Sequence, residues 1–131
     1  MIEKVFVYGT LRRGEPNRPL IEPLVASSLP ARVRGDMYTL GEYPAVIPGG
    51  GRVRGELLGF TDLAEALRRM DELESYHGPG DPRNEYERAV VRAELEDGRT
   101  EDCYCYLYAK PYFLQRFARP VPGGDWLARR L

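Results

Sequence analysis

Side chains that commonly act as nucleophiles or metal ligands are scarce in this sequence. It contains two cysteines, Cys103 and Cys105, and one histidine, His77. A structural zinc site needs about four cysteine or histidine ligands, so we expect no metal centre. His77 lies in the run His-Gly-Pro-Gly-Asp-Pro, which predicts a loop, and it is either the base of a catalytic triad or an ordinary loop residue. The two cysteines lie two apart in a predicted strand, at about 6.6 Å between Cα atoms, which disfavours a disulfide and suits two residues facing the core.

A carboxylate in an unexpected position is the most informative feature. The spacing of apolar residues predicts a helix from Thr61 to about Ser75. At about 100° per residue, Glu74 falls about 20° from Leu63, inside the apolar stripe of this helix. A carboxylate buried there has a raised pKa and is a candidate for proton transfer. Alternatively, the helix ends early and Glu74 turns outward, or Glu74 pairs with an arginine.

The second feature is the segment Tyr8-Gly9-Thr10-Leu11-Arg12-Arg13-Gly14, which follows a short apolar run. Gly9 allows a sharp backbone turn, and successive backbone N–H groups after such a turn can form an anion-binding nest. The Gly-Lys-Ser/Thr ending of a P-loop is missing. An ordinary turn between a strand and a loop explains the same residues. The two arginines either attract an anionic substrate or are solvated surface charges.

Length and composition exclude several classes of protein. With 131 residues, 43% of them hydrophobic, we expect a single domain over residues 1–131. Nineteen basic and twenty acidic residues give a net charge of −1, which argues against a nucleic-acid binder. The sequence contains no run of about 18 apolar residues, so we expect no membrane-spanning helix. The first eight residues lack the apolar core of a signal peptide and favour a strand, so we expect a cytoplasmic protein.

The coarse pattern is of five or six strands with one main helix. Asp62 and Glu65 have the spacing of a capping box at the start of that helix. The alternation in residues 100–109 puts Tyr104, Tyr106 and Tyr108 on one face of a strand. In the tail, Trp126 is expected to hold the chain end to the body. The predicted strands are Lys4–Tyr8, Ala31–Leu40, Arg52–Phe60, Tyr86–Leu95 and Thr100–Ala109, with loops at 12–23, 41–51 and 77–83. This pattern predicts an α+β fold whose sheet curls toward a small barrel.

The segment Val5-Phe6-Val7-Tyr8-Gly9-Thr10-Leu11 resembles the opening of the gamma-glutamylcyclotransferase-like (AIG2-like) families, and most closely the gamma-glutamylamine cyclotransferases and their bacterial relatives. The resemblance continues through Tyr43-Pro44-Ala45-Val46-Ile47, Val53-Arg54-Gly55-Glu56-Leu57, Met70-Asp71-Glu72-Leu73-Glu74-Ser75-Tyr76 and Tyr86-Glu87-Arg88. It implies a small mixed β-barrel. It also implies that Glu74 is the catalytic acid/base and that Tyr8, Gly9, Thr10 and Leu11 bind the substrate. Ser75 is a departure, because many members have glycine after the glutamate.

The implied reaction accounts for the few conventional catalytic residues. In this family the α-amine of a γ-glutamyl group attacks its own γ-carbonyl, so that 5-oxoproline forms and an amine leaves. Because the nucleophile belongs to the substrate, the enzyme needs no serine, cysteine or histidine, and we expect no cofactor. One carboxylate can serve both proton transfers, typically with a gain of about 10²–10⁴-fold. The backbone N–H groups of Gly9 to Leu11 would bind the α-carboxylate or stabilise an oxyanion.

Other interpretations of the same residues stay open. Tyr86 either lines the site and orients Glu74 or packs as a strand aromatic, and Tyr106 has the same two interpretations. The chain could also be a small-molecule binding module on the same fold, or a structural subunit of a larger assembly. A shared pocket for Glu74 and the 8–11 segment would favour the enzyme, because proton transfer needs hydrogen-bond reach. The loops at 12–23, 41–51 and 77–85 are expected to select the leaving group, while the oligomeric state is not predicted.

Overall fold

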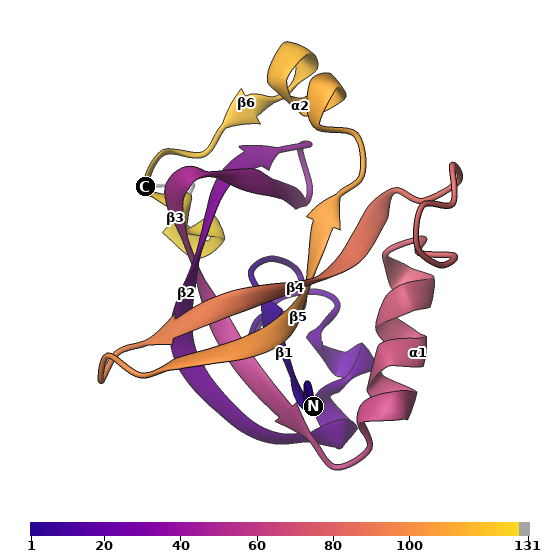
Figure 1. Ribbon diagram of the computed structural model, residues 1–131, viewed down its shortest axis with the longest axis vertical. Helices are drawn as coiled ribbons and strands as arrows, with labels where there is room; N and C mark the ends of the chain where they lie inside the picture. Colours follow the sequence, from indigo (N-terminus) through magenta and orange to yellow (C-terminus); the bar gives the residue numbers. More distant parts are fainter. Residues whose placement is uncertain (129–131) are drawn as a thin grey trace.

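The computed structural model describes residues 1–128, and its centre is a closed β-barrel (Figure 1). The strand order is β3-β1-β5-β4-β2-β6, and a further pairing of β2 with β3 closes the barrel. β1 and β5 are parallel, with Val5 opposite Tyr104, and the other neighbours are antiparallel. The mixed barrel expected from the sequence is therefore confirmed. The elements are β1 Lys4–Val7, β2 Val25–Thr39, β3 Pro44–Phe60, α1 Leu63–Leu73, β4 Tyr86–Leu95, β5 Thr100–Tyr108, α2 Pro111–Phe117 and β6 Arg119–Pro120.

Alternation along the strands divides the buried apolar residues into two clusters. One cluster fills the barrel interior and includes Phe6, Leu57, Cys103 and Cys105. The other covers the outside of the barrel beneath α1 and includes Met70 of the helix and Tyr106 of β5. Both thiols are free and buried, as the strand pattern predicts. Each of the strands β1 to β5 thus contributes residues to both clusters.

The main helix begins at a side-chain cap, as predicted. The carboxylate of Asp62 accepts a hydrogen bond from the backbone N–H of Glu65 at 3.1 Å. The Glu65 side chain accepts hydrogen bonds from Arg68 and Arg69 instead of reaching back to Asp62, so only one half of the predicted capping box forms. The helix buries Ala66 and Met70 against the barrel and runs along its side (Figure 1).

The predicted loop at 41–51 is wrong in most of its length. The chain turns at 40–43, where the Leu40 N–H donates to the Tyr43 carbonyl, and β3 then begins at Pro44. The three glycines at 49–51 lie in a bulge of β3: between the pairs Arg34–Arg52 and Asp36–Ile47, β3 has four residues and β2 has one. The N–H of Gly51 donates to the Asp36 carboxylate at 3.1 Å. A Cβ on Gly51 would collide with this carboxylate. Gly49 and Gly51 therefore suit a bent strand, because a Cβ at either position would lie less than 3.0 Å from the Asp36 carboxylate.

Two other parts of the chain differ from the prediction. β2 begins at Val25, six residues before the predicted start at Ala31. A second, seven-residue helix, α2, follows β5 and was not predicted. Both segments lack a clear apolar periodicity and are ordered by their neighbours: β2 by pairing with β3, and α2 through Leu114, which is fully buried.

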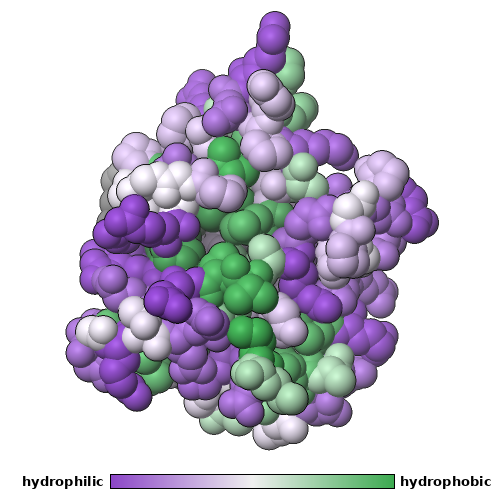
Figure 2. Space-filling model, viewed as in Figure 1, coloured by the Kyte–Doolittle hydropathy of each residue, from purple (hydrophilic) through white to green (hydrophobic). Residues whose placement is uncertain are grey.

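The tail returns to the barrel after β6. Trp126 is fully buried in the interior cluster, which confirms its predicted role as an anchor. Figure 2 shows hydrophobic residues in a strip down the middle of one face, with hydrophilic residues on both sides. In the described part of the chain, no helix is long and apolar enough to cross a membrane.

Candidate active site

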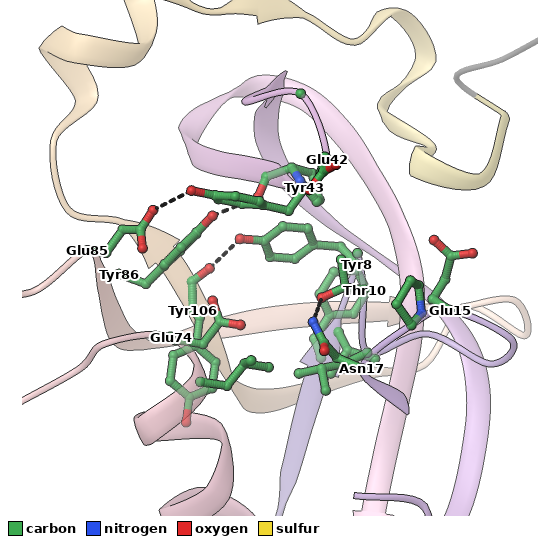
Figure 3. A pocket seen from close by; sticks show the side chains of 18 residues that line it. Tyr8, Thr10, Glu15, Asn17, Glu42, Tyr43, Glu74, Glu85, Tyr86 and Tyr106 are labelled. Atoms are coloured by element: carbon green, nitrogen blue, oxygen red, sulfur yellow. Dashed lines mark hydrogen bonds between the residues drawn. The ribbon is translucent and has the colours of Figure 1, made fainter. Parts of the chain in front are cut away.

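A cavity of about 640 Å³ opens at one side of the barrel, within the size range of small-molecule sites (Figure 3). Glu74 and all four residues of the Tyr8–Leu11 segment line it, together with Tyr86 and Tyr106. Glu74 and the 8–11 segment therefore share one pocket, which is the arrangement expected to favour an enzyme. The complete lining is Phe6, Val7, Tyr8, Gly9, Thr10, Leu11, Glu15, Pro16, Asn17, Gly41, Glu42, Tyr43, Pro44, Leu73, Glu74, Glu85, Tyr86 and Tyr106.

The way α1 ends explains how Glu74 reaches the cavity. The helix ends at Leu73, and Glu74 is the residue that caps it. Ser75 follows with φ of 52°, in the left-handed region. The N–H of Ser75 donates to the Glu72 carbonyl, and the N–H of Tyr76 donates to the Asp71 carbonyl at 2.9 Å. These two bonds form a Schellman motif, whose left-handed position usually holds glycine. The helix thus ends about where the sequence predicts, but the Glu74 side chain enters the cavity instead of turning outward (Figure 3).

The environment of Glu74 favours its protonated form. The residue is half-buried: its carboxylate is surrounded by protein but opens on the cavity. Burial raises the pKa of Glu74 to about 8, and the negative charge of Glu85 adds to the increase. No described residue forms a salt bridge or side-chain hydrogen bond with this carboxylate, so the predicted alternative of an arginine partner is not observed in residues 1–128. A carboxyl group with a pKa near neutrality can both accept and donate a proton at physiological pH.

The Tyr8–Leu11 segment forms a tight turn against β3. A Cβ on Gly9 would lie 2.5 Å from the ring of Pro44, so a larger residue does not fit without movement. Asn17 holds the turn from the other side: its amide donates to the Thr10 hydroxyl at 3.0 Å, and its backbone N–H donates to the Thr10 carbonyl. Within residues 1–128, no carbonyl accepts a hydrogen bond from the backbone N–H of Gly9, Thr10 or Leu11. Three adjacent donors at the cavity are suited to an anionic group.

Ion pairs fix this turn to the barrel. Glu56 of β3 accepts hydrogen bonds from the side chain of Arg18 at 2.8 Å and from the backbone of Arg13 at 3.1 Å. Arg18 is buried and also donates to the Leu11 carbonyl. Arg12 pairs with Glu56 and with Asp125 of the tail. Neither Arg12 nor Arg13 lines the cavity, and Arg12 serves to connect the turn with the tail.

Hydrogen bonds join the two halves of the site. The Tyr8 hydroxyl donates to the backbone carbonyl of Tyr106 at 2.6 Å, and the Tyr106 hydroxyl donates to Asp71 at 2.5 Å. Asp71 also accepts two bonds from Arg88, whose guanidinium lies between two tyrosine rings. Since Asp71 is three residues before Glu74, this chain of contacts sets the position of the helix end relative to the turn.

Tyr86 lines the cavity but does not contact Glu74 through a hydrogen bond. Its hydroxyl donates to the Pro44 carbonyl at 2.8 Å, and its ring packs edge-on against Tyr108. His77 is exposed, lies outside the cavity lining, and donates its backbone N–H to Asn84. No group of three or more potential metal ligands occurs among the described residues.

The cavity also contains residues that the sequence did not single out. Glu15, Glu42 and Glu85 lie around its edge, and the Tyr43 hydroxyl donates to Glu85 at 3.0 Å (Figure 3). Each lies in a polar loop, where a glutamate gives no signal in the sequence. The one indication in the sequence is that all three lie in the loops expected to select the leaving group.

Known proteins resemble this chain along nearly its whole length. Residues 5–128 match the model of a family described as gamma-glutamyl cyclotransferase, AIG2-like. The gamma-L-glutamyl-butirosin B gamma-glutamyl cyclotransferase of Niallia circulans is 36% identical over 129 residues, covering 97% of this chain and 77% of that protein. The human gamma-glutamylaminecyclotransferase is 32% identical over 143 residues, covering 92% of this chain and 86% of that protein.

A solved structure shows the same fold. The solution structure of the Escherichia coli protein ytfP superposes with a TM-score of 0.63 at 25% identity, covering 98% of this chain and 99% of that one. The family model covers nearly the whole chain, and both curated relatives exceed 30% identity. The chain therefore belongs to the gamma-glutamyl cyclotransferase, AIG2-like family of enzymes.

Proposed function

We propose that this protein is a γ-glutamyl cyclotransferase in which Glu74 transfers the protons and the Tyr8–Leu11 turn binds the γ-glutamyl group. The observation that carries the proposal is that the unpaired Glu74 carboxylate and the donors of the turn line one cavity. Family membership supports the reaction, and the geometry supports the two roles. The substrate is a small γ-glutamyl compound whose leaving group is an amine or amino acid.

The reaction begins with removal of a proton from the α-ammonium of the substrate. Its positive charge close to Glu74 favours the carboxylate form, which accepts that proton. The α-nitrogen then attacks the γ-carbonyl carbon, a C–N bond forms in the five-membered ring, and the original amide C–N bond breaks. Glu74 gives this first proton to the departing nitrogen. It then passes on in the same way the second proton, which the α-nitrogen loses once its bond to the γ-carbon has formed. In total the α-nitrogen loses two protons and the leaving nitrogen gains two, so an ammonium product and 5-oxoproline account for every atom.

The turn supplies orientation and charge stabilisation. The N–H groups of Gly9, Thr10 and Leu11 are the donors available for the substrate α-carboxylate or for the oxyanion at the γ-carbon. Because no arginine or lysine lines the described cavity, these backbone groups carry the recognition of negative charge. Holding the chain in its cyclising conformation converts the attack into a positioned intramolecular step.

The test is release of 5-oxoproline from a panel of γ-glutamyl amines and dipeptides, measured by mass spectrometry. Wild type, E74Q and E96Q are compared, because Glu96 is an exposed residue of the β4–β5 turn outside the cavity. We expect wild type and E96Q to release 5-oxoproline and E74Q to be slower by about 10²–10⁴-fold. Near-ultraviolet circular dichroism would show whether each variant is folded.

Two results would contradict the proposal in different ways. Release that survives in folded E74Q would remove Glu74 from the mechanism while keeping the activity. No release from any compound by folded wild type would favour a binding module on the same fold. The cytoplasmic location stays a prediction from the sequence.

A further inference from the structure

The end of α1, where Glu74 leaves the helix, carries an excess of negative charge. Asp71 and Glu72 lie in the last turn, Glu74 is the capping residue, and this turn holds no basic residue. The partial negative charge of a helix C-terminus disfavours carboxylates at this end and favours cations. Arg68, one turn earlier, lies 3.9 Å from Glu72, but both side chains are largely exposed. A cation that stabilises this end of the helix must therefore come from another element.

Arg88 of β4 supplies that cation. Its Nη1 atom donates to both oxygens of Asp71, at 2.8 and 2.7 Å. The guanidinium carbon lies 5.2 Å from the ring centroids of Tyr76 and of Tyr104, within the range of cation–π contacts. The side chains of Arg88 and Asp71 are 23% and 26% exposed, so solvent and salt screen this ion pair less than the exposed pairs of the surface.

The two partners of Arg88 at the helix end lie on either side of Glu74 in the chain. Asp71 precedes Glu74 by three residues, and Tyr76 follows it by two. The N–H of Tyr76 also donates to the Asp71 carbonyl at 2.9 Å. Arg88 therefore holds the backbone before and after Glu74, in a segment that includes the left-handed Ser75. A segment fixed at both ends has little freedom to move the carboxylate between them.

The same contacts connect the helix end with the Tyr8–Leu11 turn. The Tyr106 hydroxyl of β5 donates to Asp71 at 2.5 Å, and the Tyr106 carbonyl accepts the hydrogen bond of the Tyr8 hydroxyl at 2.6 Å. One residue of β5 thus contacts both halves of the site. The Glu74 carboxylate itself has no side-chain partner within residues 1–128, so its position depends on the backbone that carries it.

We propose that Arg88 is a positioning residue of the reaction, which binds Asp71 and Tyr76 and thereby holds the Glu74 carboxylate at the reacting nitrogen atoms of the substrate. This inference rests on the proposed function, because it assigns Arg88 a part in the proton transfers of Glu74. Arg88 does not line the cavity, so it acts through the helix end. Proton transfer requires hydrogen-bond reach, and a displacement of about 1 Å can cost about 10²-fold in rate.

The first test compares kcat and KM of wild type, R88Q, R88K and R92Q, with the γ-glutamyl compound of the panel that wild type cyclises fastest. R92Q is the matched control, because Arg92 lies on the same strand and pairs with Asp102 at 3.2 Å on the exposed surface. We expect R88Q to lower kcat per folded protein by about 10–10²-fold. KM should change little, because the Tyr8–Leu11 turn keeps its own contacts. R88K keeps a positive charge beside Asp71 and should restore part of the rate, and R92Q should keep the wild-type kcat.

A double variant then shows whether Arg88 acts through Asp71. D71N keeps an oxygen for the Tyr106 hydroxyl but loses the ion pair with Arg88. Since the two residues share one effect, kcat of D71N/R88Q should be close to that of the slower single variant, whereas independent effects would multiply. A merely structural role would lower the melting temperature of R88Q and leave kcat per folded protein at the wild-type value. Either an unchanged kcat in folded R88Q or effects that multiply fully would overturn the proposal.

A measurement without turnover separates this proposal from the proposed function. Protein containing ¹³C-labelled glutamate is titrated by NMR, and the Glu74 carboxyl signal is identified by its absence in E74Q. Burial raises the pKa of Glu74 to about 8 in wild type. In R88Q a displaced and better solvated carboxyl group should have a lower pKa, whereas loss of a direct attraction by the Arg88 charge would raise it. The other titratable groups around Glu74 are the same in both proteins: Tyr8, Tyr43, Glu85, Tyr86, Cys105 and Tyr106.

The outcomes of this titration are distinct from those of the activity assay. An unchanged or raised pKa of Glu74 in R88Q would overturn the positioning role of Arg88. If wild type released no 5-oxoproline, the proposed reaction would fail, and the titration would still decide whether Arg88 holds Glu74 in place. If R88Q does not fold, R88K gives the same comparison, with a smaller decrease in the pKa expected.

Discussion

Replacing Glu74 by glutamine should change how the stability of the protein depends on pH. Burial raises the pKa of Glu74 from 4.5 to about 8 in the folded protein. In the unfolded chain the carboxyl group has its ordinary pKa near 4.5. Between these two values the folded protein binds a proton that the unfolded chain has released. The free energy of unfolding of wild type therefore falls as the pH rises through this range.

The size of the effect follows from the same two values. At about 1.4 kcal/mol per pH unit, the difference between 4.5 and 8 amounts to at most about 5 kcal/mol. The carboxylate opens on the cavity, where solvent screening lowers this limit, so we expect roughly 2–4 kcal/mol. E74Q has no charge at this position and does not lose this stability. The stability of E74Q relative to wild type should thus increase by that amount between pH 5 and pH 9.

The measurement is urea unfolding of both proteins at several pH values in this range. Taking the difference between the two proteins at each pH cancels the titration of the other groups and the constant effect of the amide. E96Q serves as the control for the loss of a carboxyl group outside the cavity, because Glu96 is exposed. A flat difference between wild type and E74Q would refute the reasoning, since it would mean that Glu74 titrates normally.

Three other substitutions test the frame of the site. Gly9→Ala should destabilise the protein by about 1–3 kcal/mol and lower kcat/KM, because the new Cβ overlaps the Pro44 ring; Gly50→Ala, whose Cβ meets open space, is the control in urea unfolding. Ser75→Gly should raise the stability by up to about 1 kcal/mol, because Ser75 has φ of 52°, and a loss of stability would disprove the strain. Trp126→Ala should lower the free energy of unfolding by about 3–5 kcal/mol, whereas Leu127→Ala, at a partly exposed position, should have a small effect. An equal decrease in melting temperature for both variants would contradict the anchoring role of Trp126.

The regular parts of the fold could be predicted from local pattern. The alternation in residues 100–109 identified β5 and its two faces, and the spacing of apolar residues identified α1 to within two residues at each end. The errors fall where neighbours outweigh local preference. The glycines at 49–51 favour a loop by themselves, but pairing with β2 keeps them in β3. The short helix α2 has only seven residues, too few for a clear periodicity, and Leu114 holds it.

The sequence by itself identified the candidate residues, and the resemblance of its motifs to a known family implied the type of chemistry. The scarcity of histidine and cysteine, the glutamate in an apolar stripe and the Tyr-Gly-Thr-Leu turn are properties of residue type and spacing. They led to one carboxylate and one set of backbone donors before any distance was known.

Only the tertiary structure decided how these parts act together. Glu74 and Gly9 are separated in the chain by β2, β3 and α1, and closure of the barrel brings them to one cavity. The raised pKa of Glu74 depends on burial and on the charge of Glu85, both of which arise only when separate segments pack. The grouping of Glu15, Glu42 and Glu85 in the cavity lining has the same origin, because these glutamates come from loops that the sequence shows as unrelated polar segments. Local sequence sets which groups are present, and long-range packing sets their distances, their solvation and hence their chemistry.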